Sequence, residues 1–77
     1  MNFEQWFIDA KEAIERLEEG TKFCVKDLFE GTKWGTLSPG EKRSFGRYFS
    51  NALKDGNISN IERNGESKIH SNKYIKL

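Results

Sequence analysis

The first part of the chain places apolar side chains at a helical spacing. Between residues 3 and 19 they recur every three or four positions, which is the period of one face of an α-helix. Most of the positions between them are polar, with many carboxylates, and Gly20 follows as a stop signal. The pattern predicts an amphipathic helix over 3–19 that buries Trp6 and Phe7 and turns an acidic face outward.

The next segment is shorter and changes its period. Over 21–25, apolar and polar residues alternate, as they do in a half-buried β-strand. Residues 26–30 predict a short second helix with its apolar pair turned inward. The glycine-flanked segment 31–37 predicts a turn, in which we expect the Trp34 ring to fill the gap between two helices.

The strongest helix signal covers residues 39–55. Ser38 is a good N-cap residue, and Pro39 suits the first helical position. Glu41, three residues after the serine, completes a capping box, in which the side chain of each residue accepts a hydrogen bond from the backbone N–H of the other. Gly56 is the matching stop signal.

The two sides of this helix differ in chemistry. At about 100° per residue, Phe45, Phe49 and Ala52 gather on one side, with Tyr48 and Leu53 near its edges. That side is apolar, which predicts burial. The opposite side carries guanidinium, ammonium and hydroxyl groups that a ligand could contact; its residues are Arg43, Arg47, Ser50 and Lys54.

Gly46 lies inside the same helix, where glycine costs about 1 kcal/mol relative to alanine. Two interpretations account for it. Close packing against the second helix or the Trp34 ring is the one we favour, and the other is close approach of a ligand backbone. Gly46→Ala separates them, because a packing role predicts lost stability whereas a contact role predicts lost binding.

After the stop glycine the composition changes to asparagine, serine, isoleucine and lysine, which ends the helical pattern. Residues 58–76 predict a β-hairpin with Asn64-Gly65 at its tip. An odd-numbered loop centred on Gly65 pairs Ile61 with Ile69, so that both isoleucines share one face. The same register pairs Glu62 with Lys68, places Ile75 and Leu77 on the Ile69 face, and leaves the other face to His70, Tyr74 and Lys76.

This order of elements defines the expected fold. A chain of 77 residues has surface enough for one core, so residues 1–77 are expected to form a single domain. The order helix, short strand, short helix, long helix and hairpin is that of an α+β, winged-helix-like domain. A recognition helix enters the major groove with its N-terminal part. That role falls here to the helix 39–55, and the hairpin would be the wing.

Three motifs carry a resemblance to a family. They are KDLF at 26–29, the glycine-flanked Trp34, and FGRYF at 45–49, within a longer similarity that extends to Tyr74. Over residues 20–77 the chain resembles a domain-of-unknown-function family of small proteins from Gram-positive bacteria and their mobile elements. The resemblance implies a compact winged-helix-like fold, and it brings no established activity.

Charge is distributed unevenly, although the formal net charge is only +1. Residues 2–19 carry six acidic against two basic side chains, a balance of −4, and the remainder has a balance of +5. A small nucleic-acid-binding protein shows such asymmetry when one face attracts phosphates and the far face is acidic. Solvated charge without a partner explains the asymmetry equally well, so the sequence leaves both interpretations open.

Cysteine and histidine usage limits the chemistry. Cys24 and His70 are single residues of their kinds, which excludes an internal disulfide and argues against a metal site or a nucleophile paired with a base. We therefore expect no enzyme activity, no metal and no cofactor. The acidic N-terminus does not resemble a signal peptide, and no apolar run reaches the ~20 residues of a membrane span. A cytoplasmic protein without a membrane partner is expected.

These observations favour a small DNA-binding protein, a transcriptional regulator or accessory factor of a bacterium or its mobile element. The alternative is a protein-interaction module, an inhibitor or adaptor on a winged-helix frame, that binds a protein through the acidic first helix or the Arg43 face. Self-association through Trp6 would give a homodimer. For double-stranded DNA, we expect the major groove to be read by Arg43, Ser44, Arg47 and Ser50, and phosphates to be neutralised by Lys42, Lys54, Arg63 and Lys68.

Overall fold

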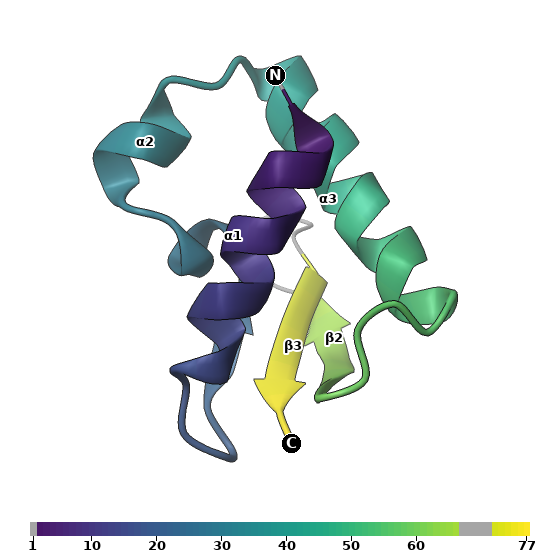
Figure 1. The fold of residues 1–77 in the computed structure, drawn as a ribbon. Coiled ribbons are helices and arrows are strands. Elements are labelled where there is room, and N and C mark those ends of the chain that lie inside the picture. Colours follow the sequence, from purple (N-terminus) through teal and green to yellow (C-terminus); the bar gives the residue numbers. More distant parts are fainter. Residues whose placement is uncertain (1, 67–71) are drawn as a thin grey trace.

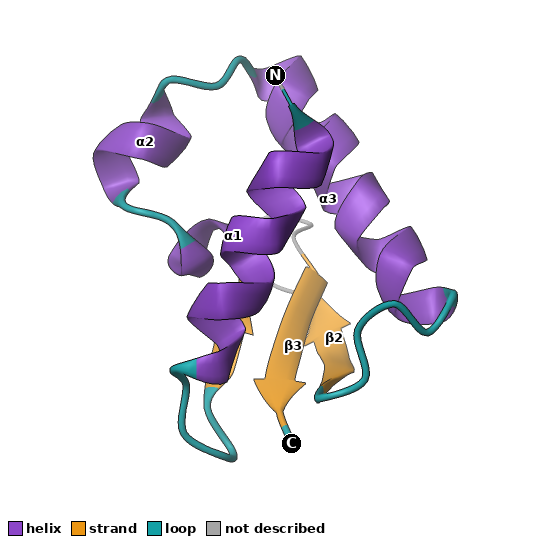
Figure 2. Cartoon of the chain, in the orientation of Figure 1, coloured by secondary structure: helices purple, strands orange, loops and turns teal. Residues whose placement is uncertain are grey.

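The computed structural model describes residues 2–66 and 72–77 and shows helices packed against a three-stranded antiparallel sheet. The elements, in chain order, are α1 (Phe3–Glu15), β1 (Lys22–Cys24), the 3-10 helix η1 (Val25–Leu28), α2 (Gly31–Gly35), α3 (Pro39–Lys54), β2 (Ile61–Glu66) and β3 (Asn72–Lys76). In Figure 1, α1 crosses the view between α2 and α3. Figure 2 shows the strands gathered away from the N-terminal ends of α1 and α3. The predicted α+β class and the predicted order of elements are confirmed.

α1 begins where the sequence predicts and ends early. The Gln5 N–H donates to the Asn2 side-chain oxygen over 3.1 Å, which caps the helix. The helix stops at Glu15, before the predicted end at residue 19, and the N–H of the C-cap residue Arg16 donates to the carbonyls of Ala13 and Ile14. The last turn has no basic residue, so the helix dipole gives little support to a longer helix. Gly20, with a φ of 85°, then turns the chain, and its N–H donates to a carbonyl of β3 at 2.7 Å.

The segment between β1 and α3 differs from the prediction. The expected helix over 26–30 is replaced by the shorter η1, and α2 forms inside the expected turn 31–37. Phe29 and Glu30 have extended backbone angles, which separate the two short helices. The Trp34 ring stacks on Phe29 with centroids 5.8 Å apart and also meets rings of α1 and α3. Trp34 therefore fills the gap between helices as predicted, and these long-range contacts hold α2 in place.

A second contact ties α2 to α1. The Lys33 ammonium nitrogen lies 3.3 Å from a carboxylate oxygen of Asp9 and 4.9 Å from the centroid of a Trp6 ring. The ion pair is partly exposed, so its contribution to stability is small, and the cation–π contact adds about 0.5–1 kcal/mol. Lys33 therefore acts as a link between the two helices.

α3 begins and ends within one residue of the prediction, and its capping box is present. The Ser38 hydroxyl accepts from the Glu41 N–H at 3.1 Å, and the Glu41 carboxylate accepts from the Ser38 N–H at 3.0 Å. The backbone bond from Ser38 favours the carboxylate and lowers the pKa of Glu41. Because this pKa is lower in the folded chain than in the unfolded chain, the box stabilises α3 above the ordinary pKa of glutamate. That contribution is lost as the pH falls through the folded-state pKa.

The apolar side of α3 forms the centre of the core, as predicted. Phe45 and Phe49 are fully buried, and Ala52 is 6% exposed. Five rings surround Phe45 with centroids 5.8–6.4 Å away: Phe3, Trp6, Phe29, Trp34 and Tyr48. Aromatic pairs at such distances stabilise a core beyond the area they bury. Burial therefore sets which way α3 faces.

The strand order is β1-β3-β2, and the predicted register of the hairpin is wrong. Ile61 pairs with Lys76, and Glu62 pairs with Ile75. The partners that the sequence predicts lie outside the described residues, as does the histidine expected near them; they are Ile69, Lys68 and His70.

The cause of the error is the Asn64-Gly65 dipeptide, which was assigned to the tip. It lies within β2, where Gly65 has a φ of 85° and the register shifts between Arg63 and Glu66. A β-bulge adds an unpaired residue in this way, and glycine tolerates the left-handed backbone that it requires. A strong turn signal therefore marks a bulge here, and the strand continues beyond it.

The faces of β3 are also exchanged relative to the prediction. Tyr74, expected on the outer face, is fully buried between Phe23 and Phe49, with ring centroids 5.9 and 5.1 Å away. Ile75 is half-buried, and Leu77 is 52% exposed. A slip of one residue moves every side chain to the opposite face, and the large tyrosine ring buries more area than isoleucine does. Tyr74 therefore closes the core between the sheet and α3.

The Tyr74 hydroxyl is buried, and the described residues give it no hydrogen-bond partner. An unsatisfied buried group of this kind costs about 1–3 kcal/mol. We therefore expect Tyr74→Phe to leave the free energy of unfolding unchanged or to raise it by about 1 kcal/mol in chemical denaturation. Tyr48→Phe, on a ring that is 37% exposed, is the control and should change nothing. A loss above about 1 kcal/mol in Tyr74→Phe would show that its hydroxyl is bonded in the folded protein.

Candidate nucleic-acid interface

The outward side of α3 carries three aligned cations. Arg43 and Arg47 are one turn apart and Lys54 follows two turns later; all three are exposed, and the half-buried Ser50 lies between them. This set is named the basic face: Arg43, Arg47, Ser50 and Lys54. Because the other side of α3 is locked into the core, the basic face is held in a fixed orientation toward solvent.

The cations of the basic face form no salt bridge with any described acidic residue. Within residues 2–66 and 72–77, Arg43, Arg47 and Lys54 make no salt bridge, whereas Lys33 on α2 does pair with Asp9 on α1. A cation without a partner does not have to break a contact before it binds an anion. Guanidinium groups can bond a phosphate or a guanine edge bidentately, and an ammonium group acts as a point charge. The basic face is therefore suited to nucleic acid.

Gly46 borders the basic face, and the packing interpretation favoured for it is wrong. Among residues 2–66 and 72–77, a Cβ atom built on Gly46 would meet nothing within 4 Å beyond its two chain neighbours and the backbone of its own helix. Trp34 packs instead on the Phe45 side, about 100° away around the helix. The described residues therefore leave open space over Gly46, and none of the elements they form requires glycine there.

The remaining predicted residues are distributed over two elements. Ser44 is exposed beside the basic face, whereas Lys42 is half-buried toward the core side of α3. Arg63 is exposed on β2 and pairs with Tyr74, so it leaves the sheet on the face that packs against α3. Lys68 lies outside the described residues. The structure thus groups the residues predicted on α3 on one side, with the exception of Lys42.

The acidic side of α1 holds a residue that sequence reasoning missed. Ile8 is 42% exposed and lies one turn from Glu4 and from Glu12, which are both exposed. The helical period could have found it, because Ile8 falls about 100° from Phe7 and outside the buried side. α1 therefore presents an apolar side chain within a row of carboxylates.

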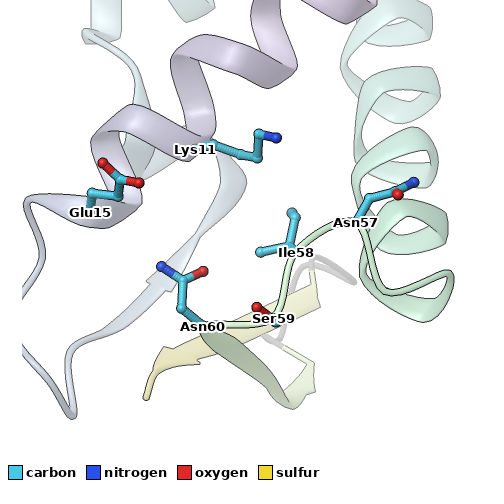
Figure 3. Close-up of a pocket in the computed structure, with 6 residues that line it drawn as sticks. All are labelled: Lys11, Glu15, Asn57, Ile58, Ser59 and Asn60. Carbon is cyan, nitrogen blue, oxygen red and sulfur yellow. The ribbon is translucent and has the colours of Figure 1, made fainter.

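A shallow depression lies between α1 and the loop that follows α3 (Figure 3). Lys11 and Glu15 line it from α1, residues 57–60 line it from the loop, and Ile58 points into it. The Lys11 ammonium nitrogen is placed 5.1 Å from the Phe7 ring centroid. Its polar groups have both signs of charge and do not converge on one ligand chemistry, so the depression indicates no specific ligand.

Other kinds of site find no support in the described part of the chain. No three His, Cys, Asp or Glu side chains gather there as a metal ion would require. None of the helices described is both long and apolar enough to cross a bilayer. Cys24 is a half-buried free thiol on β1. The basic face of α3 is therefore the strongest candidate site among the described residues.

Comparison with known proteins identifies a family and no function. A family model described as a domain of unknown function (DUF1413) matches residues 9–76. No curated protein and no solved structure matches the chain. The match confirms that the chain resembles a family of unknown function. It begins within α1, so the family region includes the second half of that acidic helix and is wider than the resemblance over 20–77.

Proposed function

Because this chain belongs to the DUF1413 family, a domain of unknown function, we propose its function from its own surface: it is a small non-enzymatic protein that binds double-stranded DNA. The basic face carries the proposal, since its cations are exposed, aligned and without salt bridges within the described residues. Phosphates complement such a row, and arginine also recognises guanine edges. A cytoplasmic transcriptional regulator or accessory factor of a bacterium or its mobile element fits this chemistry.

The proposed complex uses α3 as the recognition helix of a winged-helix-like domain. The order of elements and the β1-β3-β2 sheet behind α3 support this frame. The first turn of α3 is closed by its own capping box, so anion binding falls to side chains and not to the helix N-terminus. Arg43 and Ser44 occupy the half of α3 that would approach base edges, and Lys54 would contact the DNA backbone at the other end.

Salt dependence tests this proposal. With about four to six phosphate contacts, the logarithm of affinity is expected to fall with the logarithm of salt concentration with a slope near −4 to −5. Fluorescence anisotropy of a labelled duplex between about 50 and 200 mM salt measures that slope. The proposal is contradicted if the protein does not bind duplex DNA at the lowest salt concentration, or if its affinity does not change with salt concentration.

A protein-interaction module is the second candidate, and the exposed Ile8 on α1 favours it. An inhibitor or adaptor would place this side chain in an apolar pocket of its partner while Glu4 and Glu12 met basic residues around the pocket. Two results together would favour protein interaction over DNA binding. The protein would fail to bind DNA, and it would form a stoichiometric complex with one purified protein that Ile8→Asp abolishes.

A further inference from the structure

We propose that Gly46 is the point at which the sugar-phosphate backbone of DNA lies directly against α3. This inference rests on the proposed function and specifies how the site works. The contact surface, named the notch, consists of Arg43, Gly46, Arg47 and Ser50. It places two guanidinium groups and a hydroxyl around one position that has no side chain.

Neither backbone geometry nor packing by the described residues explains a glycine at this position. Gly46 lies inside a 16-residue helix, and positive φ angles occur elsewhere, at Gly20, Gly56 and Gly65. An added Cβ would meet no atom of another described element within 4 Å. Glycine is nevertheless destabilising in a helix interior relative to alanine. A contact that forms only when a ligand binds accounts for a residue that the folded chain itself does not need.

The spacing of the notch defines what would lie in it. Residues three or four positions apart are neighbours on a helix, and Gly46 and Arg47 are each three or four positions from both Arg43 and Ser50, so they lie between those two residues. Arginine side chains are long enough to reach either a base edge or a phosphate from this face, whereas the serine hydroxyl lies close to the helix surface. A DNA strand can bond Ser50 only if it approaches the helix closely, and the missing side chain of Gly46 leaves room for that approach. Phosphate oxygens accept hydrogen bonds from both kinds of donor.

Gly46→Ala gives the first test, with opposite expected effects on stability and on binding. The melting temperature should rise, because alanine favours the helix and meets open space. The affinity for a labelled duplex at about 50 mM salt should fall about tenfold. Gly31→Ala on α2 is the matched control, since it also adds a methyl group where Gly31 has no described neighbour within 4 Å, and its affinity should equal that of the wild type.

A double-mutant cycle with Ser50→Ala gives the second test. Ser50→Ala should weaken binding in the wild-type background and have no effect beside Gly46→Ala, because the methyl group already holds the strand away from the hydroxyl. Wild-type affinity in Gly46→Ala, a lowered melting temperature, or additive effects would overturn the inference. Each of these results is distinct from failure of the proposed function, in which the wild-type protein itself does not bind the duplex.

Discussion

Replacing Arg43 and Arg47 together by glutamate is expected to weaken binding to duplex DNA about 100-fold or more at low salt. The substitutions would remove the two proposed phosphate or base contacts and add two charges that DNA repels. Both side chains are exposed and make no salt bridge among the described residues, so the melting temperature should stay within a few degrees of the wild type. Fluorescence anisotropy and circular dichroism on the same samples measure the two quantities.

A second charge reversal separates a located site from a general effect of net charge. Lys22→Glu with Lys26→Glu changes the net charge by the same amount, and both lysines are exposed on β1 and η1. We expect this control to weaken binding by less than about tenfold. Equal losses of DNA affinity in the two double variants would mean that binding depends only on the net charge of the protein. That result would contradict a DNA site on the basic face.

Phe45→Ala is expected to lower the free energy of unfolding by about 3–5 kcal/mol. Phe45 is fully buried, and five aromatic rings pack around it, so its removal leaves a cavity where α1, α2, α3 and the Phe29 linker meet. A chain of this size has a total stability of about 4–11 kcal/mol, so the variant should be largely unfolded near body temperature. Chemical denaturation followed by circular dichroism measures the loss.

Tyr48→Ala is the control for this effect, because Tyr48 belongs to the same aromatic cluster but is 37% exposed. It should cost clearly less, about 1–2 kcal/mol, since part of its ring already contacts water. Suppose that Phe45→Ala unfolded cooperatively and lost less free energy of unfolding than Tyr48→Ala. The core would then not be centred on α3, and burial of α3 would not explain the fixed orientation of the basic face.

The helix α3 could be predicted from the sequence because its signals are local. Ser38 and Glu41 lie three residues apart and cap the same turn, and the apolar period from Phe45 to Ala52 lies within one element. The same period also predicts where Arg43 points, because a helix with one side buried must turn the other side to solvent. This part of the fold and the position of the basic face therefore needed no tertiary information.

The sheet and the surroundings of Gly46 could not be predicted in this way. Register depends on a partner strand far along the chain, and the bulge at Gly65 looked like a turn because glycine permits both conformations. Tyr74 is buried because Phe23 and Phe49 converge on it from two other elements. Whether anything packs over Gly46 likewise depends on where distant rings settle. These features come from tertiary packing, which a single sequence does not display.

The most direct measurement of the central claim is an amide nuclear magnetic resonance titration of the protein with short duplex DNA. If α3 binds DNA through its basic face, the largest chemical-shift changes will fall on the amides of Arg43, Gly46 and Arg47. The chemical shifts of the Glu4 and Ile8 amides on α1 will not change. Changes centred on α1, or a spectrum that DNA leaves unaltered, would contradict the claim.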